Sequence, residues 1–282
     1  MKSIRQTLQI TSAMKLISTA KLRRARVQLV QTEPYFDRIR ETMNDIVCHG
    51  IDVHEEYFSA RTDRVAGTQR AILVITSDKG LAGGFNHNII KLAEETLLPG
   101  DSNFLMLLGN IGWRHFSRTH IPILETFRYS TSVPTVYEAK DIADFALDQY
   151  TSGTIDEFHI VYTRMYSSVK LVPEAIQVLP LDVDVLGKEC RKSVSSGHLN
   201  YSPSPKAVLE TLIPKYLAGV VYGAMVENFA SEHSARMAAM DNATKNAQDM
   251  LDGLMLKYNR LRQSAITQEV TEIVAGAAAL NA

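Results

Sequence analysis

The sequence predicts an α/β fold in which a small Rossmann-like domain is inserted between two long terminal helices that form an antiparallel, left-handed coiled coil. Both ends of the chain carry apolar residues at helical spacing, and the last segment is rich in good helix formers. Between them, short apolar runs alternate with amphipathic segments, which is typical of an α/β domain. We therefore expect an N-terminal coiled-coil helix over residues 1–56, an α/β domain over 70–190, and a C-terminal helix over 206–282 that pairs with the first.

The first segment is a predicted helix to about residue 49, with Ile10, Met14 and Ile17 on its apolar face. Pro34 falls inside it, so we expect a kink or short interruption near Glu33. Residues 1–32 hold seven basic side chains and no acidic one. Such a stretch is compatible with an organelle-targeting peptide or with a basic helix face that meets an acidic partner or water. The second interpretation is favoured because the helical pattern continues without a cleavage-like break.

The middle segment alternates strands with helices. The first predicted strand, 71–75, is a continuous apolar run that leads into a glycine cluster and a helix, as in a buried parallel strand. The last two strands are joined by a short link and are expected to form an antiparallel pair at the sheet edge. The predicted strands are 71–75, 104–108, 121–127, 158–163 and 175–181, and the predicted helices are 87–98, 111–118 and 139–149. Linkers are predicted over 50–69 and 185–205.

The last segment has apolar or small residues at spacings of three and four, such as Met240, Ala243 and Ala247. Roughly 70 helical residues would extend about 100 Å, at about 1.5 Å per residue. Because the first helix is shorter, the final residues are expected to continue as a single helix. Their small apolar end, residues 275–280, favours insertion into an apolar sleeve of a partner over a frayed terminus.

Composition and motifs argue against several functions. The chain is 45% hydrophobic and 22% charged with a net charge of -1, which is ordinary soluble composition and does not favour nucleic-acid binding. No apolar run approaches the roughly 18 residues of a membrane span. The glycine-rich stretch 77–86 matches neither common phosphate-binding motif, so tight turn geometry is favoured over nucleotide binding. The histidines are dispersed and Asp141 and Asp144 suit a helix start, so we expect no catalytic residue, cofactor or metal site.

Several stretches also resemble the gamma subunit of F-type ATP synthases. They are residues 10–16 (ITSAMKL), 20–24 (AKLRR), 77–86 (SDKGLAGGFN), 258–273 (YNRLRQSAITQEVTEI) and 276–279 (GAAA). The resemblance covers essentially the whole chain, including its helix–α/β–helix order, and the C-terminal stretch is the most specific.

The resemblance implies a central rotor shaft, without catalytic residues of its own, that couples ion-driven rotation of the c-ring to ATP synthesis and hydrolysis. The expected partners are the alpha3-beta3 hexamer, the epsilon subunit and the c-ring, with no nucleic acid and with membrane contact only through the c-ring. The family positions near the catch loops of beta and the upper bearing correspond to Arg236, Arg262, Gln263, Thr267 and Glu269. Met14 and Lys21 correspond to positions near the acidic lever loop of beta, and Tyr201 to one near the c-ring.

The same resemblance implies a peripheral protein on the cytoplasmic face of a bacterial inner (plasma) membrane. The two cysteines, Cys48 and Cys190, are far apart, and a cysteine-pair insertion of the chloroplast type is absent. Family members usually carry further residues ahead of Lys2, so this chain is expected to start late. Two alternatives remain at the level of sequence: a nucleotide-binding α/β enzyme with a helical dimerisation arm, and a self-associating coiled-coil scaffold.

Overall fold

The computed structural model describes residues 1–48, 55–58, 68–99, 102–181, 201–202 and 204–280 of the 282-residue chain. The chain divides into two units, one formed by residues 1–18 and 237–282 and the other by residues 19–236. Two long helices, α1 (Lys2–Cys48) and α7 (Pro205–Leu280), contribute to both units. The α/β architecture with long terminal helices is therefore confirmed.

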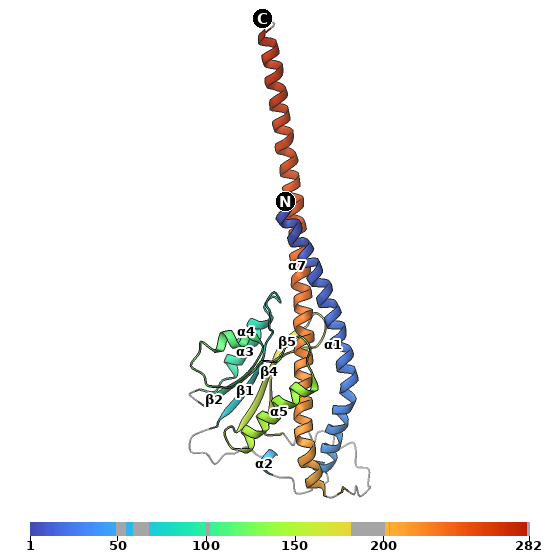
Figure 1. The fold of residues 1–282 in the computed structure, drawn as a ribbon, viewed down its shortest axis with the longest axis vertical. Helices are drawn as coiled ribbons and strands as arrows, with labels where there is room; N and C mark the ends of the chain where they lie inside the picture. The colour runs from blue at the N-terminus through green and yellow to red at the C-terminus, as the bar shows by residue number, and fades with distance from the viewer. Residues whose placement is uncertain (49–54, 59–67, 100–101, 182–200, 203, 281–282) are drawn as a thin grey trace. The chain divides into compact units, whose positions relative to one another are not determined.

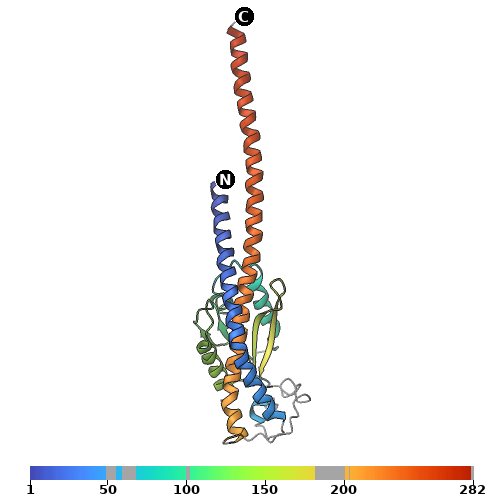
Figure 2. The same ribbon diagram turned by 90° about the vertical axis from the view of Figure 1, so that its right-hand side faces the viewer.

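Within the first unit, the ends of α1 and α7 pair side by side. Thr244 Oγ1 donates a hydrogen bond to Thr11 Oγ1 at 2.8 Å, and Lys15 Nζ lies 2.5 Å from Asp241 Oδ1. Because the later residue of α1 in these two contacts, Lys15, meets the earlier residue of α7, Asp241, the two helices run antiparallel, as predicted (Figures 1 and 2). Lys15 and Lys245 lower the pKa of Asp241 to about 2, which keeps its carboxylate charged.

The same antiparallel pairing continues within the second unit. The Phe36 ring on α1 lies 6.1 Å from the Tyr222 ring on α7 and covers Gly219, where an added Cβ would stand 2.3 Å from Phe36 Cδ1. Helix α1 contributes Ala25, Met43 and other buried residues to the same core. Glycine at position 219 thus lets the aromatic ring approach the α7 backbone closely.

Two details about proline differ from the sequence prediction. Helix α1 runs through Pro34 without an interruption, because the helix on either side is held by packing, including that of Phe36 on α7, whereas the alternative of a kink near Glu33 stays a prediction. Pro205 belongs to α7 as its first residue rather than to the preceding linker. Ser204 accounts for this start, since its Oγ accepts a hydrogen bond from the Ala207 N–H at 3.2 Å, and proline is favoured at the first helical position.

The second unit contains one five-stranded mixed sheet in the order β3-β2-β1-β4-β5. Its strands are β1 (Arg70–Ile75), β2 (Asn103–Leu108), β3 (Ile123–Phe127), β4 (Glu157–Met165) and β5 (Leu171–Leu179). The first four run parallel to one another, and β5 pairs antiparallel with β4 at the edge. All five predicted strands and the antiparallel edge pair are confirmed.

Helices cover both faces of this sheet (Figure 1). Helices α3 (Phe85–Thr96) and α4 (Asn110–Phe116) pack on one face, against Ile72, Val74 and their neighbours. Helix α5 (Val136–Thr151) and the long helices pack on the other face, against Leu73 and Met106. Alternate residues of β1 therefore face two different cores, as expected for a strand buried on both sides.

The predicted linker over residues 50–69 is only partly described and contains one helical turn, α2 (Glu55–Phe58). The first helix was expected to extend to residue 56, but residues 49–54 lie outside the described residues. Residues 185–200 of the second predicted linker also lie outside them. Among the described residues, no helix combines the length and apolar character needed to cross a membrane.

Candidate functional site

The glycine-rich loop that leads from β1 into α3 is tied together by its own side chains. Asn86 Oδ1 accepts a hydrogen bond from the Ser77 N–H at 3.0 Å, and Asn86 Nδ2 donates to Ser77 Oγ at 2.7 Å. Leu81 has φ 66° and Gly83 has φ 60°, so two residues in this short turn adopt left-handed backbone conformations. Gly83 therefore serves a tight turn, as predicted from the sequence, whereas Gly80 and Gly84 have neither a left-handed backbone nor a close contact at an added Cβ.

Arg236 on α7 binds this loop from inside the second unit. Its Nη2 donates to the carbonyl oxygens of Lys79 and Gly80, each at 3.1 Å, and lies 2.6 Å from Glu232 Oε1. Its Nη1 lies 3.2 Å from His233 Nδ1. We call these contacts the Arg236 network. Only 8% of the Arg236 side chain is exposed, so its guanidinium is engaged within the second unit, and its contact with beta stays a prediction.

Burial controls the ionisation of the network. Burial, with help from Arg236 and Lys21, lowers the pKa of His233 to about 3, so this imidazole is neutral near pH 7 and its Nδ1 can accept from Arg236. Burial also raises the pKa of Glu232, an effect that its ion pair with Arg236 offsets only in part. The Arg236 network therefore consists of one buried ion pair and a neutral histidine. This arrangement suits the attachment of the glycine-rich loop to α7 better than it suits proton transfer.

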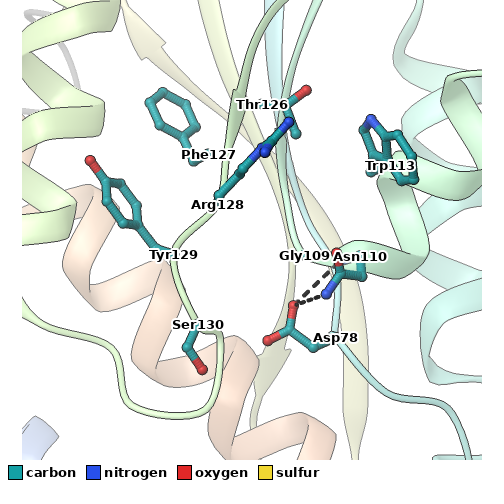
Figure 3. A pocket seen from close by; sticks show the side chains of 9 residues that line it. All are labelled: Asp78, Gly109, Asn110, Trp113, Thr126, Phe127, Arg128, Tyr129 and Ser130. Atoms are coloured by element: carbon teal, nitrogen blue, oxygen red, sulfur yellow. Dashed lines mark hydrogen bonds between the residues drawn. The ribbon is translucent and has the colours of Figure 1, made fainter.

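A cleft of about 620 Å³ opens at the carboxyl ends of β1, β2 and β3 (Figure 3). It is lined by Asp78, Gly109, Asn110, Trp113, Thr126, Phe127, Arg128, Tyr129 and Ser130. Asp78 joins its two sides: Oδ1 accepts from the Asn110 backbone N–H at 3.3 Å and from Asn110 Nδ2 at 3.2 Å, and Oδ2 accepts from the Thr131 N–H at 3.1 Å. These bonds use the only carboxylate among the nine lining residues, so the cleft shows no acid–base pair.

Sequence reasoning missed this cleft. A signal was available, because ligands and partners often bind at the carboxyl ends of parallel strands, and Asp78 and Gly109 directly follow two predicted strands. Trp113 was not singled out, although it is the only tryptophan of the chain and is 46% exposed. Among the described residues, no group of three or more histidine, cysteine or carboxylate side chains could hold a metal ion.

The other predicted contact residues lie on the long helices and at the start of α7. Arg262, Gln263, Thr267 and Glu269 are all exposed on α7, where the Thr267 hydroxyl donates to the Gln263 carbonyl at 2.9 Å. The structure brings these four together on one stretch of helix in the first unit, whereas Arg236 belongs to the second unit.

The remaining three predicted residues are only half-buried. Met14 lies on α1 in the first unit, and Lys21 lies on α1 in the second, with its Nζ 6.0 Å from the centroid of the Phe229 ring. Tyr201 packs against the core of the second unit, and burial raises the pKa of its phenol.

Comparison with known proteins gives consistent results. A family profile described as ATP synthase matches residues 1–280. An ATP synthase gamma chain of Acetivibrio thermocellus is 47% identical over 99% of this chain and 96% of the relative. One of Ruminiclostridium cellulolyticum is 46% identical with the same coverage. A gamma chain of Acetobacterium woodii described as sodium ion specific is 36% identical, again with the same coverage.

Solved structures show the same fold. A chain from the central stalk and c-ring of the Tetrahymena thermophila mitochondrial ATP synthase has a TM-score of 0.61 at 22% identity, and the match covers 83% of this chain and 99% of that one. A chain from the Euglena gracilis mitochondrial enzyme has a TM-score of 0.64 at 19% identity, covering 99% and 91%. On the strength of the full-length sequence matches, the chain belongs to the ATP synthase gamma chain family.

Proposed function

We propose that the chain is the central rotor shaft of an F-type ATP synthase, coupling ion-driven rotation of the c-ring to ATP synthesis and hydrolysis at the alpha and beta subunits. The observation that carries this proposal is the end of α7. Among the residues of this helix whose burial the structure describes, Leu251 is the last buried one, and every residue from 252 to 276 is exposed. The exposed residues include Leu261, Ile266, Val270 and Ile273.

The end of α7 is a helix with many exposed apolar side chains, and we infer that a partner covers it. Exposed apolar side chains in such number normally mark a surface that a partner covers. Helices in proteins also gain most of their stability from packing rather than from intrinsic propensity. An apolar sleeve around the helix, formed by the ring of three alpha and three beta subunits, would satisfy both requirements. Side chains with few directional hydrogen bonds would let the helix turn in that sleeve without a strongly preferred orientation.

We assign the partner contacts in the same terms. Arg262, Gln263, Thr267 and Glu269 would meet the catch loops of beta and the upper bearing, and their exposure supports this assignment. Met14 and Lys21 would meet the acidic lever loop of beta, which suits a first helix that carries no acidic residue up to Thr32. Tyr201 would lie near the c-ring.

Arg236 needs a different role within this proposal. A direct contact with a catch loop would require its guanidinium to leave Glu232 and two carbonyl oxygens inside the second unit. Exposing or breaking a buried ion pair is costly. We therefore propose that Arg236 supports the shaft from within and influences beta only indirectly.

In this function the chain supplies no catalytic group, cofactor or metal, and the chemistry of ATP belongs to the alpha and beta subunits. The epsilon subunit would bind to the α/β domain, nucleic acid would play no part, and the membrane would be met only through the c-ring. The chain would be a peripheral protein on the cytoplasmic face of a bacterial inner membrane. The nucleotide-binding enzyme considered above has less support, because the glycine-rich loop is engaged by Asn86 and Arg236.

A truncation of α7 tests this function. Ending the chain after Leu261 removes a segment that is exposed throughout residues 262–276, so the second unit should fold unchanged while assembly with the alpha and beta ring, or the torque developed in it, falls. Ending the chain after Leu280 is the matched control and should leave both unchanged. Folding is checked by circular dichroism, assembly by counting subunits in the purified complex, and torque by single-molecule rotation. Normal assembly and torque after the first truncation would disprove the role of the helix end.

A further inference from the structure

Three polar side chains of α7 bind the backbone of the β4–β5 hairpin. Asn228 Oδ1 accepts a hydrogen bond from the Thr163 N–H at 3.0 Å, and Ser231 Oγ donates to the Thr163 carbonyl oxygen at 2.9 Å. Ser234 Oγ donates to the Ser168 carbonyl oxygen at 2.7 Å. The three side chains follow one another at intervals of three along α7 and are at most 2% exposed. We call Asn228, Ser231 and Ser234 the α7 seam.

The α7 seam supplies hydrogen bonds to the end of β4, where the neighbouring strand β1 no longer pairs with it. Strand β1 pairs with β4 only as far as Val161, while β4 itself continues to Met165. On the other side of β4, Thr163 faces Pro173 of β5, which has no N–H to donate. Buried backbone groups are almost always paired, and because Pro173 cannot donate to the Thr163 carbonyl, this carbonyl needs another donor. Helix α7 provides it through Ser231, and through Asn228 it also accepts from the Thr163 N–H.

The Arg236 network continues the attachment to the next part of the domain. Two carbonyl oxygens of the glycine-rich loop, those of Lys79 and Gly80, accept from Arg236 Nη2. From Asn228 to Arg236, α7 is thus bonded to both the hairpin and the loop over about 12 Å of helix, at about 1.5 Å per residue. All of these residues belong to the second unit.

The hydrogen bonds of the seam and of Arg236 are directional, whereas the apolar contacts of α7 are not. Buried side chains such as Val221, Val226 and Phe229 hold the helix on the sheet, but apolar burial has no preferred direction. A helix held by such contacts alone can turn or slide slightly at little cost. Hydrogen bonds weaken steeply when their angle changes, so the seam and the Arg236 network resist rotation of α7 about its own axis.

We propose that the α7 seam, together with Arg236, fixes the rotational position and register of α7 on the sheet, so that torque passes between the α/β domain and the shaft without slip. Asn228, Ser231, Ser234 and Arg236 are then positioning residues for torque transmission. This inference rests on the proposed rotor function and adds to it the place where the two parts of the rotor are joined.

The test uses the purified complex of this chain with its alpha and beta partners, with the ring fixed to a surface and a bead attached to the thiol introduced by Tyr137→Cys. The Tyr137 side chain is 83% exposed, so the substitution and the bead should leave the core intact. The triple variant Asn228→Ala, Ser231→Ala, Ser234→Ala removes three of the five bonds of the seam and the Arg236–loop contact. If the five bonds act as equal parallel springs, removing three of them leaves two-fifths of the stiffness, so the variance of the bead angle should rise by up to about 2.5-fold. Val226→Ala, on the same stretch of α7, is the matched control because it removes buried apolar volume and no hydrogen bond.

Both variants should lower stability, but only the triple variant should broaden the angular distribution and lower the load at which rotation and ATP turnover uncouple. Equal broadening in the two variants, or none in either, would refute the inference. If the triple variant does not assemble, Ser234→Ala alone removes the least buried bond of the seam and is expected to show the same change to a smaller extent. A wild-type complex that does not rotate would instead overturn the proposed function, and the inference with it.

Discussion

The contact between Gly219 and Phe36 allows a sharp test of how α1 and α7 pack. In Gly219→Ala, the new Cβ would stand 2.3 Å from Phe36 Cδ1 and 2.8 Å from Cγ and Cε1. Ordinary carbon contacts begin near 3.5 Å, so the ring must move by about 1 Å. Overpacking of this kind costs about 1–3 kcal/mol. Replacing glycine by alanine inside a helix returns about 1 kcal/mol, so the net loss of stability is predicted to be about 0–2 kcal/mol.

Gly223→Ala is the matched control, because Gly223 lies one turn further along α7 and has no atom within 4 Å of its added Cβ. This variant gains the helix-propensity term alone and should be about 1 kcal/mol more stable than wild type. The difference between the two variants isolates the steric term and should be about 1–3 kcal/mol. Urea unfolding of the full chain, followed by circular dichroism, measures it. Equal stabilities would mean that α1 does not pack against Gly219 as described.

A double variant strengthens this test. Phe36→Leu removes the ring that causes the clash, at the expense of some buried apolar area. If the steric account is correct, Gly219→Ala should cost less in the Phe36→Leu background than in wild type. The two substitutions would then be non-additive, as expected for residues in direct contact.

Three further predictions concern the second unit. The pKa of His233 is lowered from 6.5 to about 3 in the folded state, so its contribution to stability is fully present above pH 6.5 and is lost as the pH falls from there toward 3. The free energy of unfolding should therefore fall by about 1.4 kcal/mol per pH unit below pH 6. His233→Asn should remove this slope, which urea titrations at several pH values measure. Asn86→Ala leaves the buried Ser77 N–H without its acceptor and should cost about 1–3 kcal/mol in the same assay, whereas a loss near zero would mean that the bond is dispensable. Thr135→Ala removes the capping box at the start of α5 and should cost about 1 kcal/mol, with hydrogen exchange of the Glu138 amide as an independent measure.

Much of the fold could be predicted from the sequence because the relevant signals are local. The run at residues 71–75 is continuously apolar, which predicts a strand buried on both faces. In the structure it forms most of β1, whose residues contribute to two cores. The antiparallel pair at the sheet edge followed from the short link between residues 163 and 175. Differences arose where a tertiary contact outweighed a local preference, as for the interruption considered at Pro34, or where one capping serine decided the start of a helix, as at Pro205.

The site was harder to predict because its geometry depends on residues far apart in the chain. Arg236 lies 156 residues from Gly80, so no periodicity could indicate that its guanidinium binds the glycine-rich loop. The seam shows the same difficulty, since Ser231 looks like an ordinary small residue of a helical stripe. The exposed end of α7, by contrast, could be predicted from length alone, because the first helix is too short to cover it.

The position of Trp113 gives the molecule a built-in optical reporter. As the single indole of the chain, it is the source of all tryptophan emission, and it stands half-exposed on α4 at the wall of the cleft beside Asp78 and Arg128. Water at an exposed indole shifts emission to longer wavelength, so anything that fills the cleft and displaces this water should shift emission toward the blue. Binding at this face can therefore be followed in solution without any label.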